Sequence, residues 1–178
     1  PDVITVKHLL EDMNILGFGK AKFVMDRGFY SEDNINGMYR ERIKFIVGVR
    51  LSLKLIKTNL DLVYEDICMP MCYDESTSTY GYTVATDWDY TQTRPNKGDT
   101  IKESRRIYIH YYYSLDKMAD ETDAFDKKIA RLHKELVSGI YVESHTKEYE
   151  KYFLISRDGH SVSYNVNSIK SAKKYFGY

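Results

Sequence analysis

The chain has 178 residues, 43% of them hydrophobic, which is enough to bury the core of one compact domain or of one domain with an insertion. Lysine plus arginine and aspartate plus glutamate both number 26, so no net charge draws the chain toward nucleic acid or a membrane surface. No apolar run approaches the ~20 residues that span a bilayer, and no leader pattern opens the sequence. We therefore expect a cytoplasmic protein without membrane contact, in which nucleic-acid contacts come from local basic patches.

Helical and strand patterns alternate over the first third of the chain. Apolar residues three and four positions apart predict a helix at residues 5–15. The apolar residues 21–25 predict a buried strand that ends at Asp26. Ser31 then offers an N-cap hydroxyl for a second helix, and the apolar run at residues 44–49, with its β-branched content, predicts a second buried strand. This order indicates an α/β fold.

After residue 59, tyrosine, threonine and short alternating segments replace this rhythm. Antiparallel strands are predicted at residues 77–86 and 101–113, and residues 152–155 are predicted to pair with 162–166 across an Asp-Gly turn. Between these strands, apolar residues three and four positions apart predict one long amphipathic helix at residues 115–137. The second part of the chain is therefore expected to be rich in strands.

These patterns predict three divisions of the chain. Residues 1–59 form an α/β core segment, residues 60–171 form a β-rich insertion with the long helix, and residues 172–178 begin a strand that returns to the core. The sequence begins at Pro1 rather than at a methionine and stops just after an aromatic cluster. We expect both ends to be cut from a longer protein.

One carboxylate is a candidate site residue. Asp26 follows a predicted strand and precedes a glycine turn and a helix, which is where α/β sheets hold ligand-binding groups. The alternative is a plain turn in which the aspartate side chain accepts backbone hydrogen bonds. Spacing alone favours the turn.

A resemblance changes that balance. Residues 23–35 read Phe-Val-Met-Asp-Arg-Gly-Phe-Tyr-Ser-Glu-Asp-Asn-Ile. They resemble the segment around the second catalytic aspartate of the DDE insertion-sequence transposases, where an apolar strand ends in Asp, then Arg or Ala, Gly, an aromatic residue and a Ser-x-x-Asn-Ile helix start. Residues 44–50 and the Pro-Asp opening are also similar to the flanking pieces of that family, and a β-rich insertion is usual there.

The resemblance implies a partial RNase H-like core of strand, helix and strand, interrupted by the β-rich insertion. It implies a transposase that cleaves phosphodiesters and transfers strands at double-stranded transposon ends, as a homo-oligomer, with two aspartates and a glutamate holding two Mg²⁺ or Mn²⁺ ions. Asp26 is then a catalytic residue and metal ligand. The other two carboxylates are expected before Pro1 and after Tyr178, so we expect this fragment to bind metal weakly or not at all and to lack nuclease activity.

Basic residues are the candidate DNA contacts. Next to Asp26, Arg27 is predicted to reach a phosphate, although an ion pair with the aspartate is the alternative. Two further short basic runs are predicted to line a DNA backbone groove, although such runs are more often solvated faces. The predicted DNA-binding residues are Arg27, Arg105, Arg106, Lys173 and Lys174, with Lys102 and Lys170 beside them.

Aromatic residues give weaker signals. Trp88 resembles an insertion aromatic that captures a flipped base in some transposases, but its acidic neighbours argue against close approach to DNA. The tyrosines of residues 108–113 either stack unpaired bases or cover a core edge, and we favour the core.

The cysteines and histidines do not form a recognisable catalytic pattern. Cys68 and Cys72 match neither a C-x-x-C redox pair nor half of a zinc site, and we interpret them as reduced thiols. The acids around them are irregularly spaced, as in a solvated loop, and the five histidines are scattered without an adjacent nucleophile.

Two competing functions stay open. An RNase H-like nuclease of repair or defence would share the fold but not the transposon ends. A catalytically dead interaction module would share the sequence pattern but would not depend on Asp26.

Overall fold

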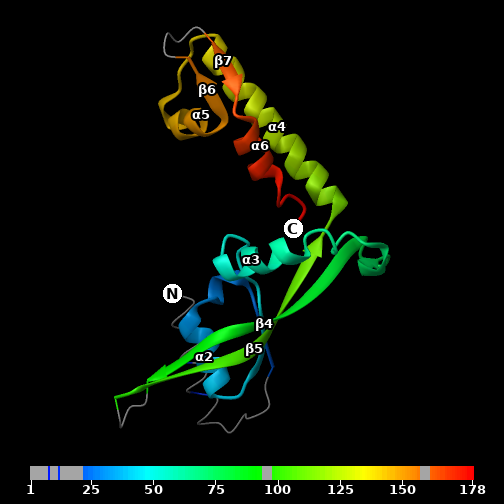
Figure 1. Ribbon diagram of the computed structural model, residues 1–178, viewed down its shortest axis with the longest axis vertical. Coiled ribbons are helices and arrows are strands. Elements are labelled where there is room, and N and C mark those ends of the chain that lie inside the picture. Colours follow the sequence, from blue (N-terminus) through cyan, green and yellow to red (C-terminus); the bar gives the residue numbers. More distant parts are fainter. Residues whose placement is uncertain (1–7, 9–11, 13–21, 94–97, 157–160) are drawn as a thin grey trace. The chain divides into compact units, whose positions relative to one another are not determined.

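The computed structural model describes residues 8, 12, 22–93, 98–156 and 161–178, and shows a mixed α/β protein (Figure 1). His8 and Asp12 are helical, but the rest of the helix predicted at residues 5–15 lies outside the described residues, as does the turn at 157–160. Within the described ranges, no helix has the length and apolar character that a membrane span needs.

Backbone contacts divide the chain into two compact units. The first contains Pro1–Asp66 and Thr83–His110, and the second contains Ile67–Tyr82 and Tyr111–Tyr178. This division differs from the predicted boundary after residue 59. Part of the predicted insertion, residues 60–66 and 83–110, belongs to the unit of the α/β segment, and Trp88 and Tyr90 from this part lie in its core.

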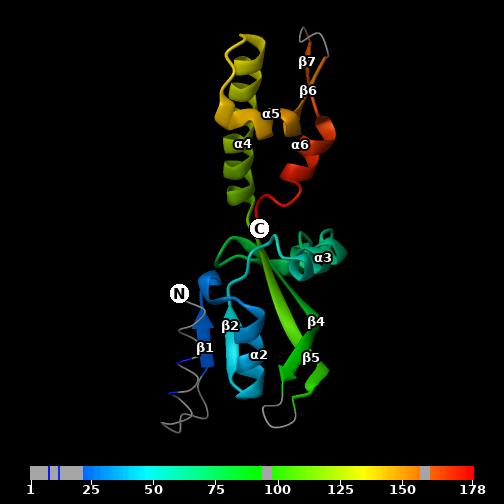
Figure 2. The same cartoon turned by 90° about the vertical axis from the view of Figure 1, so that its left-hand side faces the viewer.

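The first unit is built on a parallel strand–helix–strand motif. β1 (Lys22–Met25) and β2 (Lys44–Val47) pair in parallel, and α2 (Glu32–Arg40) connects them (Figure 2). Ser31 caps α2, since its hydroxyl oxygen accepts a hydrogen bond from a backbone amide of the first turn at 3.1 Å. Both predicted strands and the predicted helix are confirmed.

The core of the first unit covers one face of this sheet. Its fully buried members come from α2 and from the following hairpin: Ile35, Met38, Trp88 and Tyr90. On the other face, Val24 is 75% exposed and Ile46 is 52% exposed. The prediction that both strands are buried is therefore wrong for this face, because no second layer of described residues covers it.

The sequence patterns did not predict α3 (Lys54–Val63). Its buried residues Ile56 and Leu60 are four positions apart, which places them on one helix face. The boundary predicted after residue 59, where the composition of the sequence changes, falls inside this helix, and the apolar spacing was not recognised there.

A long antiparallel hairpin follows. β4 (Thr79–Thr93) and β5 (Thr100–Tyr113) lie side by side, and the short β3 (Tyr73–Asp74) pairs with β4 (Figure 1). The two predicted strands are confirmed, although β4 extends beyond the predicted end at residue 86. The division between the units falls within both long strands.

The second unit is built around the predicted long helix, α4 (Leu115–Val137), which is confirmed with the predicted bounds. Ser114 caps it by accepting a hydrogen bond from a backbone amide at 3.3 Å. The remaining elements are η3 (Glu143–His145), α5 (Thr146–Tyr152), β6 (Phe153–Ile155), β7 (Val162–Tyr164) and α6 (Val166–Lys173). The core of this unit contains Ile129, Leu132, Tyr149, Tyr152 and Phe153. β6 and β7 are antiparallel, as predicted.

The strand predicted at residues 172–178 is wrong. Asn165 caps α6, because its side-chain oxygen accepts a hydrogen bond from the Ser168 amide at 3.2 Å, and helix continues to Lys173. The aromatic residues beyond the helix lie in turns, where the Phe176 ring packs edge-on against Phe125 at 5.6 Å. Helix capping and ring packing therefore override the strand pattern here.

Candidate active site

Asp26 lies where the sequence places it, directly after the carboxyl end of β1. Its backbone is extended, and it caps the single turn η1 (Arg27–Phe29) that leads into α2. One side-chain oxygen, Oδ1, accepts a hydrogen bond from the Gly28 amide at 2.6 Å. This is the hydrogen bond that the plain-turn interpretation requires, yet the residue is exposed. The structure is therefore compatible with both interpretations of Asp26.

Gly48, the residue after the end of β2, contacts the backbone next to Asp26. The Gly48 amide donates a hydrogen bond to the Met25 carbonyl at 2.9 Å, which extends the pairing of the two strands beyond β2. A Cβ atom at Gly48 would lie 3.0 Å from the Arg27 amide nitrogen, closer than ordinary van der Waals contact. Position 48 must therefore stay small for the chain at Asp26 and Arg27 to keep its place. Spacing along the sequence gave no sign of this contact.

The residues around Asp26 do not by themselves make a divalent metal site. No group of three or more histidines, cysteines, aspartates or glutamates is clustered for metal binding within the described residues. One carboxylate offsets only half the charge of a divalent cation, and Mg²⁺ binds to oxygen ligands. Within the described residues, Asp26 is therefore not part of a cluster of three or more such ligands.

Arg27 is exposed and follows Asp26 in η1. Both residues are described by the structure, and no ion pair joins the Arg27 side chain to Asp26 there. Arg27 is exposed, and its contact with a phosphate stays a prediction.

The two arginines of β5 differ in their surroundings. The Arg105 guanidinium pairs with Glu103 at 2.5 Å and lies 5.2 Å from the centre of the Tyr90 ring. The neighbouring Arg106 is exposed, and its backbone carbonyl accepts a hydrogen bond from the Tyr39 hydroxyl at 2.9 Å. Both arginine side chains are exposed, and that of Arg105 is held by Glu103 and the Tyr90 ring.

The two predicted lysines lie in the second unit. Lys173 pairs with Asp126 at 2.5 Å, and Lys174 lies 5.1 Å from the centre of the Tyr175 ring. Arg27, Arg105 and Arg106 belong to the first unit. The five predicted DNA contacts thus divide between two units.

The aromatic candidates divide into buried and exposed side chains. Trp88 is only 7% exposed and its indole N–H donates to Asn36 Oδ1 at 2.8 Å, so its side chain is committed to the core. Tyr111 is buried, as predicted, and burial raises its pKa to about 12. The core interpretation is wrong for Tyr108 and Tyr112, which point out of the other face of β5 and are exposed.

Sequence reasoning missed a polar network in the second unit. Glu135 Oε2 accepts a hydrogen bond from the Tyr149 hydroxyl at 2.5 Å and contacts His145 Nδ1 at 2.8 Å. The hydrogen bond from Tyr149, and then that from His145, hold the pKa of Glu135 below its ordinary value. Burial, and then the hydrogen bond to Glu135, raise the pKa of Tyr149. The network joins α4 to η3 and α5, a contact that no sequence spacing could indicate.

Comparison with protein-family models, with curated proteins and with solved structures gives no match.

Proposed function

We propose that this chain carries the second catalytic aspartate of a DDE-type transposase, whose full-length form cleaves and transfers DNA strands at transposon ends with Mg²⁺ or Mn²⁺. The observation that carries the proposal is the position of Asp26, exposed at the carboxyl end of β1 in a parallel strand–helix–strand motif. Ligands of open α/β sheets bind at this end of the strands. The sequence around it, from the strand through the Ser31 cap, is the segment that resembles the family.

The surroundings of Asp26 are consistent with the proposed ligand role. The Gly28 amide engages Oδ1 and so fixes the orientation of the carboxylate. Among the described residues, nothing hydrogen-bonds to Oδ2. Arg27, exposed beside it, adds a positive charge next to a site that would meet phosphates. In the proposal, Asp26 is one ligand of a site that further carboxylates of the longer protein complete.

Asp26→Asn in the longer parent protein tests the role. Asparagine keeps an oxygen that can accept the Gly28 hydrogen bond, so the turn survives while the negative charge is lost. We expect strand transfer from a plasmid-borne transposon to fall on the order of 100-fold or more, because a metal ligand is lost. Asp33→Asn makes the same chemical change at an exposed position in the first turn of α2 and should leave activity near that of the unmodified protein. Equal activity of the Asp26 and Asp33 variants would contradict the proposal and favour an interaction module.

The chain alone provides a second test. We expect no Mg²⁺-dependent cleavage of supercoiled plasmid by the 178-residue chain. Robust cleavage that Asp26→Ala abolishes would show that the chain contains a complete active site. The proposal that it carries only one of the three carboxylates would then fall.

A further inference from the structure

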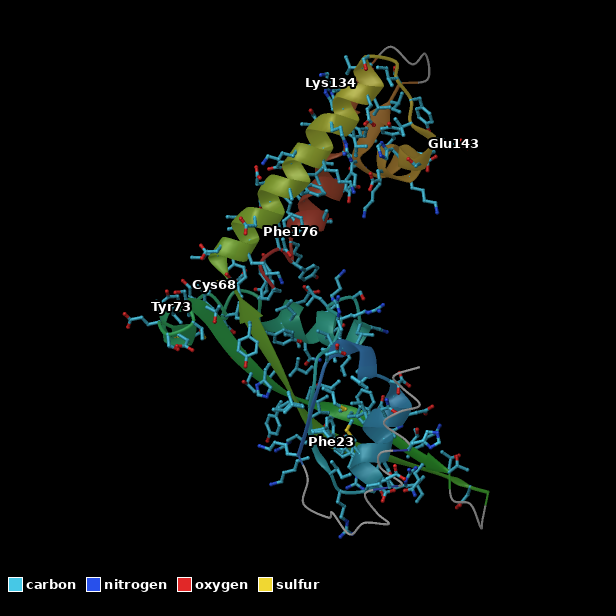
Figure 3. The ribbon with its side chains drawn as sticks, turned by 180° about the vertical axis from the view of Figure 1, so that it is seen from behind. Phe23, Cys68, Tyr73, Lys134, Glu143 and Phe176 are labelled. Carbon is cyan, nitrogen blue, oxygen red and sulfur yellow. The ribbon has the colours of Figure 1, made fainter. Side chains whose placement is uncertain are left out.

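One face of the hairpin of β4 and β5 is not used by the core of the first unit. On the opposite face, Trp88 and Tyr90 are buried in that core, and Phe23, which is labelled in Figure 3, packs against it. Side chains alternate between the two faces of a strand, so every second residue of β5 points away from the core. Within the first unit, this outer face of β5 consists of Lys102, Ser104, Arg106, Tyr108 and His110, all of them exposed.

A contact with β4 fixes one end of the outer face. His110 Nδ1 lies 2.9 Å from the Thr83 hydroxyl oxygen. Counting from this pair along the two antiparallel strands places Ala85 across from Tyr108. A side chain as small as that of alanine does not cover the tyrosine ring, so the ring stands above a low part of the sheet.

The Tyr108 side chain has no partner in the described part of the chain. It is 59% exposed. Among the described residues, its hydroxyl makes no hydrogen bond and its ring packs against no other ring. Tyr111 of the same strand points to the opposite face and is only 4% exposed. The outer face therefore presents an aromatic ring that a flat ligand can cover.

Arg106 places a positive charge beside this ring. Residues two positions apart on one strand face are about 6.6 Å apart along the strand. The Arg106 backbone is fixed, because its carbonyl accepts a hydrogen bond from the Tyr39 hydroxyl at 2.9 Å. Among the described residues, the Arg106 guanidinium forms no ion pair, even with Asp87, which the same count places across from it. The guanidinium is exposed and can donate hydrogen bonds to an anion.

The charges of this side of the hairpin are divided between its two strands. On β5 the charged residues of the outer face are Lys102 and Arg106, both basic. On β4 they are Asp87 and Asp89, both acidic. A polyanion bound here would therefore follow β5 and keep away from β4.

We propose that the outer face of β5 binds single-stranded DNA, with one unpaired base stacked on the Tyr108 ring and a neighbouring phosphate bound by the Arg106 guanidinium. Surfaces that bind single strands combine basic side chains that follow the backbone with aromatic rings on which bases stack. The choice of DNA over RNA rests on the proposed function, but the surface itself does not involve Asp26.

Two other ligands fit the outer face less well. The bases of a DNA duplex are stacked on one another, so a duplex offers no free base to a ring on a sheet surface. The centre of a protein interface is depleted of charged residues, whereas Arg106 and His110 stand on either side of the exposed ring. Unpaired bases linked by phosphates match both the ring and the cation.

The proposal is tested by fluorescence anisotropy, with the full chain titrated into a fluorescein-labelled oligothymidylate of about 15 nucleotides. Low salt favours binding, and EDTA keeps divalent metal ions out of the measurement. Tyr108→Leu should raise Kd about 10-fold, because the stacking ring is lost, whereas Tyr108→Phe keeps the ring and should stay within about 2-fold. Arg106→Gln should weaken binding and reduce the slope of log Kd against log salt by about 0.7, since one phosphate contact is lost.

Two further variants serve as controls. Tyr141 of the second unit is 58% exposed, close to the exposure of Tyr108, and Tyr141→Leu should leave Kd unchanged. Asp87→Asn removes an acid that repels phosphate and should tighten binding about 2-fold. Weaker binding by the Asp87 variant would overturn the assignment of an anionic ligand. Tyr108 and Arg106 are both exposed, so their variants should keep the circular dichroism spectrum of the unmodified chain.

The remaining outcomes separate the possible ligands. If the unmodified chain did not bind the oligothymidylate, or if Tyr108→Leu bound it equally well, the proposal would be overturned. Equal affinity for a duplex would overturn the stacked base, and tighter binding of oligouridylate would overturn the choice of DNA. Self-association in sedimentation velocity that Tyr108→Leu abolishes, without oligonucleotide binding, would assign the face to a second copy of the chain and overturn the proposal. Strand transfer by Asp26→Asn is a separate measurement, so either proposal can fail alone.

Discussion

The close approach of Gly48 to the backbone at Asp26 makes Gly48→Ala a sharp test of how the candidate active site is held. The added Cβ would lie 3.0 Å from the Arg27 amide nitrogen and 3.5 Å from the Asp26 carbonyl carbon. Both are backbone atoms, which cannot rotate away as the end of a side chain can. The segment that carries Asp26 must therefore move by a few tenths of an ångström.

Two opposing effects set the change in the free energy of unfolding. Alanine restricts the unfolded chain and so stabilises the fold by about 0.4–1 kcal/mol where the backbone permits it. Gly48 does not have a positive φ, so its conformation suits alanine. Overpacking costs about 1–3 kcal/mol and acts here on rigid backbone. We expect a net loss of about 1 kcal/mol, which corresponds to a decrease in Tm of about 2–4 °C.

Guanidinium unfolding followed by circular dichroism measures this loss, and the Gly28 amide signal in an ¹⁵N–¹H spectrum reports the hydrogen bond to Asp26. Gly81→Ala is the matched control, because its Cβ would meet only the Tyr112 ring at an ordinary 3.7 Å. That variant should stay within about 0.5 kcal/mol of the unmodified chain. If Gly48→Ala were equally stable and its Gly28 signal did not move, the close approach would not constrain the site.

Three further changes test the two cores and the polar network of Glu135. Trp88→Phe removes the indole hydrogen bond to Asn36 and should lower the free energy of unfolding by about 1–3 kcal/mol, measured by urea titration; an unchanged midpoint would show that the bond is dispensable. Leu132→Ala removes a side chain with 0% exposure and should cost about 2–5 kcal/mol by calorimetry, and a cost below about 1 kcal/mol would contradict its place in the core. The pKa of Glu135 is held below its ordinary value of 4.5 by hydrogen bonds, chiefly from Tyr149, so the stability it contributes is present above that value and is lost as the pH falls through the lower, folded-state pKa. Glu135→Gln should therefore flatten the acid limb of a plot of Tm against pH, and equal limbs would contradict this.

Local sequence patterns predicted the elements whose signals are local. The Ser31 hydroxyl and the apolar spacing of residues 115–137 correctly placed the starts of α2 and α4, because caps and helix faces depend on neighbours a few positions away. The residues after 172 show the limit of this reasoning. Their aromatic content favours a strand, but the cap at Asn165 and the contact of Phe176 with a distant ring decide for helix and turn.

Burial was harder to predict than secondary structure. An apolar run such as residues 21–25 has the same composition whether one or both faces of its strand are covered. The exposure of Val24 and Ile46 depends on which layers pack against the sheet. Sequence periodicity does not contain that information for so short a strand.

The candidate site was predicted in its position but not in its support. Asp26 was placed from the strand and glycine pattern around it, which is local. The contact with Gly48 and the ion pair of Lys173 with Asp126 join residues that are far apart in the sequence. The ion pair of Arg105 with Glu103 joins residues that are close in the sequence. Which residues contact or pair with one another depends on three-dimensional geometry, which the number of charged residues does not determine.

The path of the chain has a consequence for how this protein can be divided by genetic or proteolytic means. The polypeptide passes between the two units at residues 66–67, 82–83 and 110–111. A single cleavage or a simple truncation therefore cannot release either unit intact. A gene for the first unit alone would have to join residue 66 to residue 83 by a new linker. Because the two units alternate along the chain, neither could be transferred to another protein as one continuous segment.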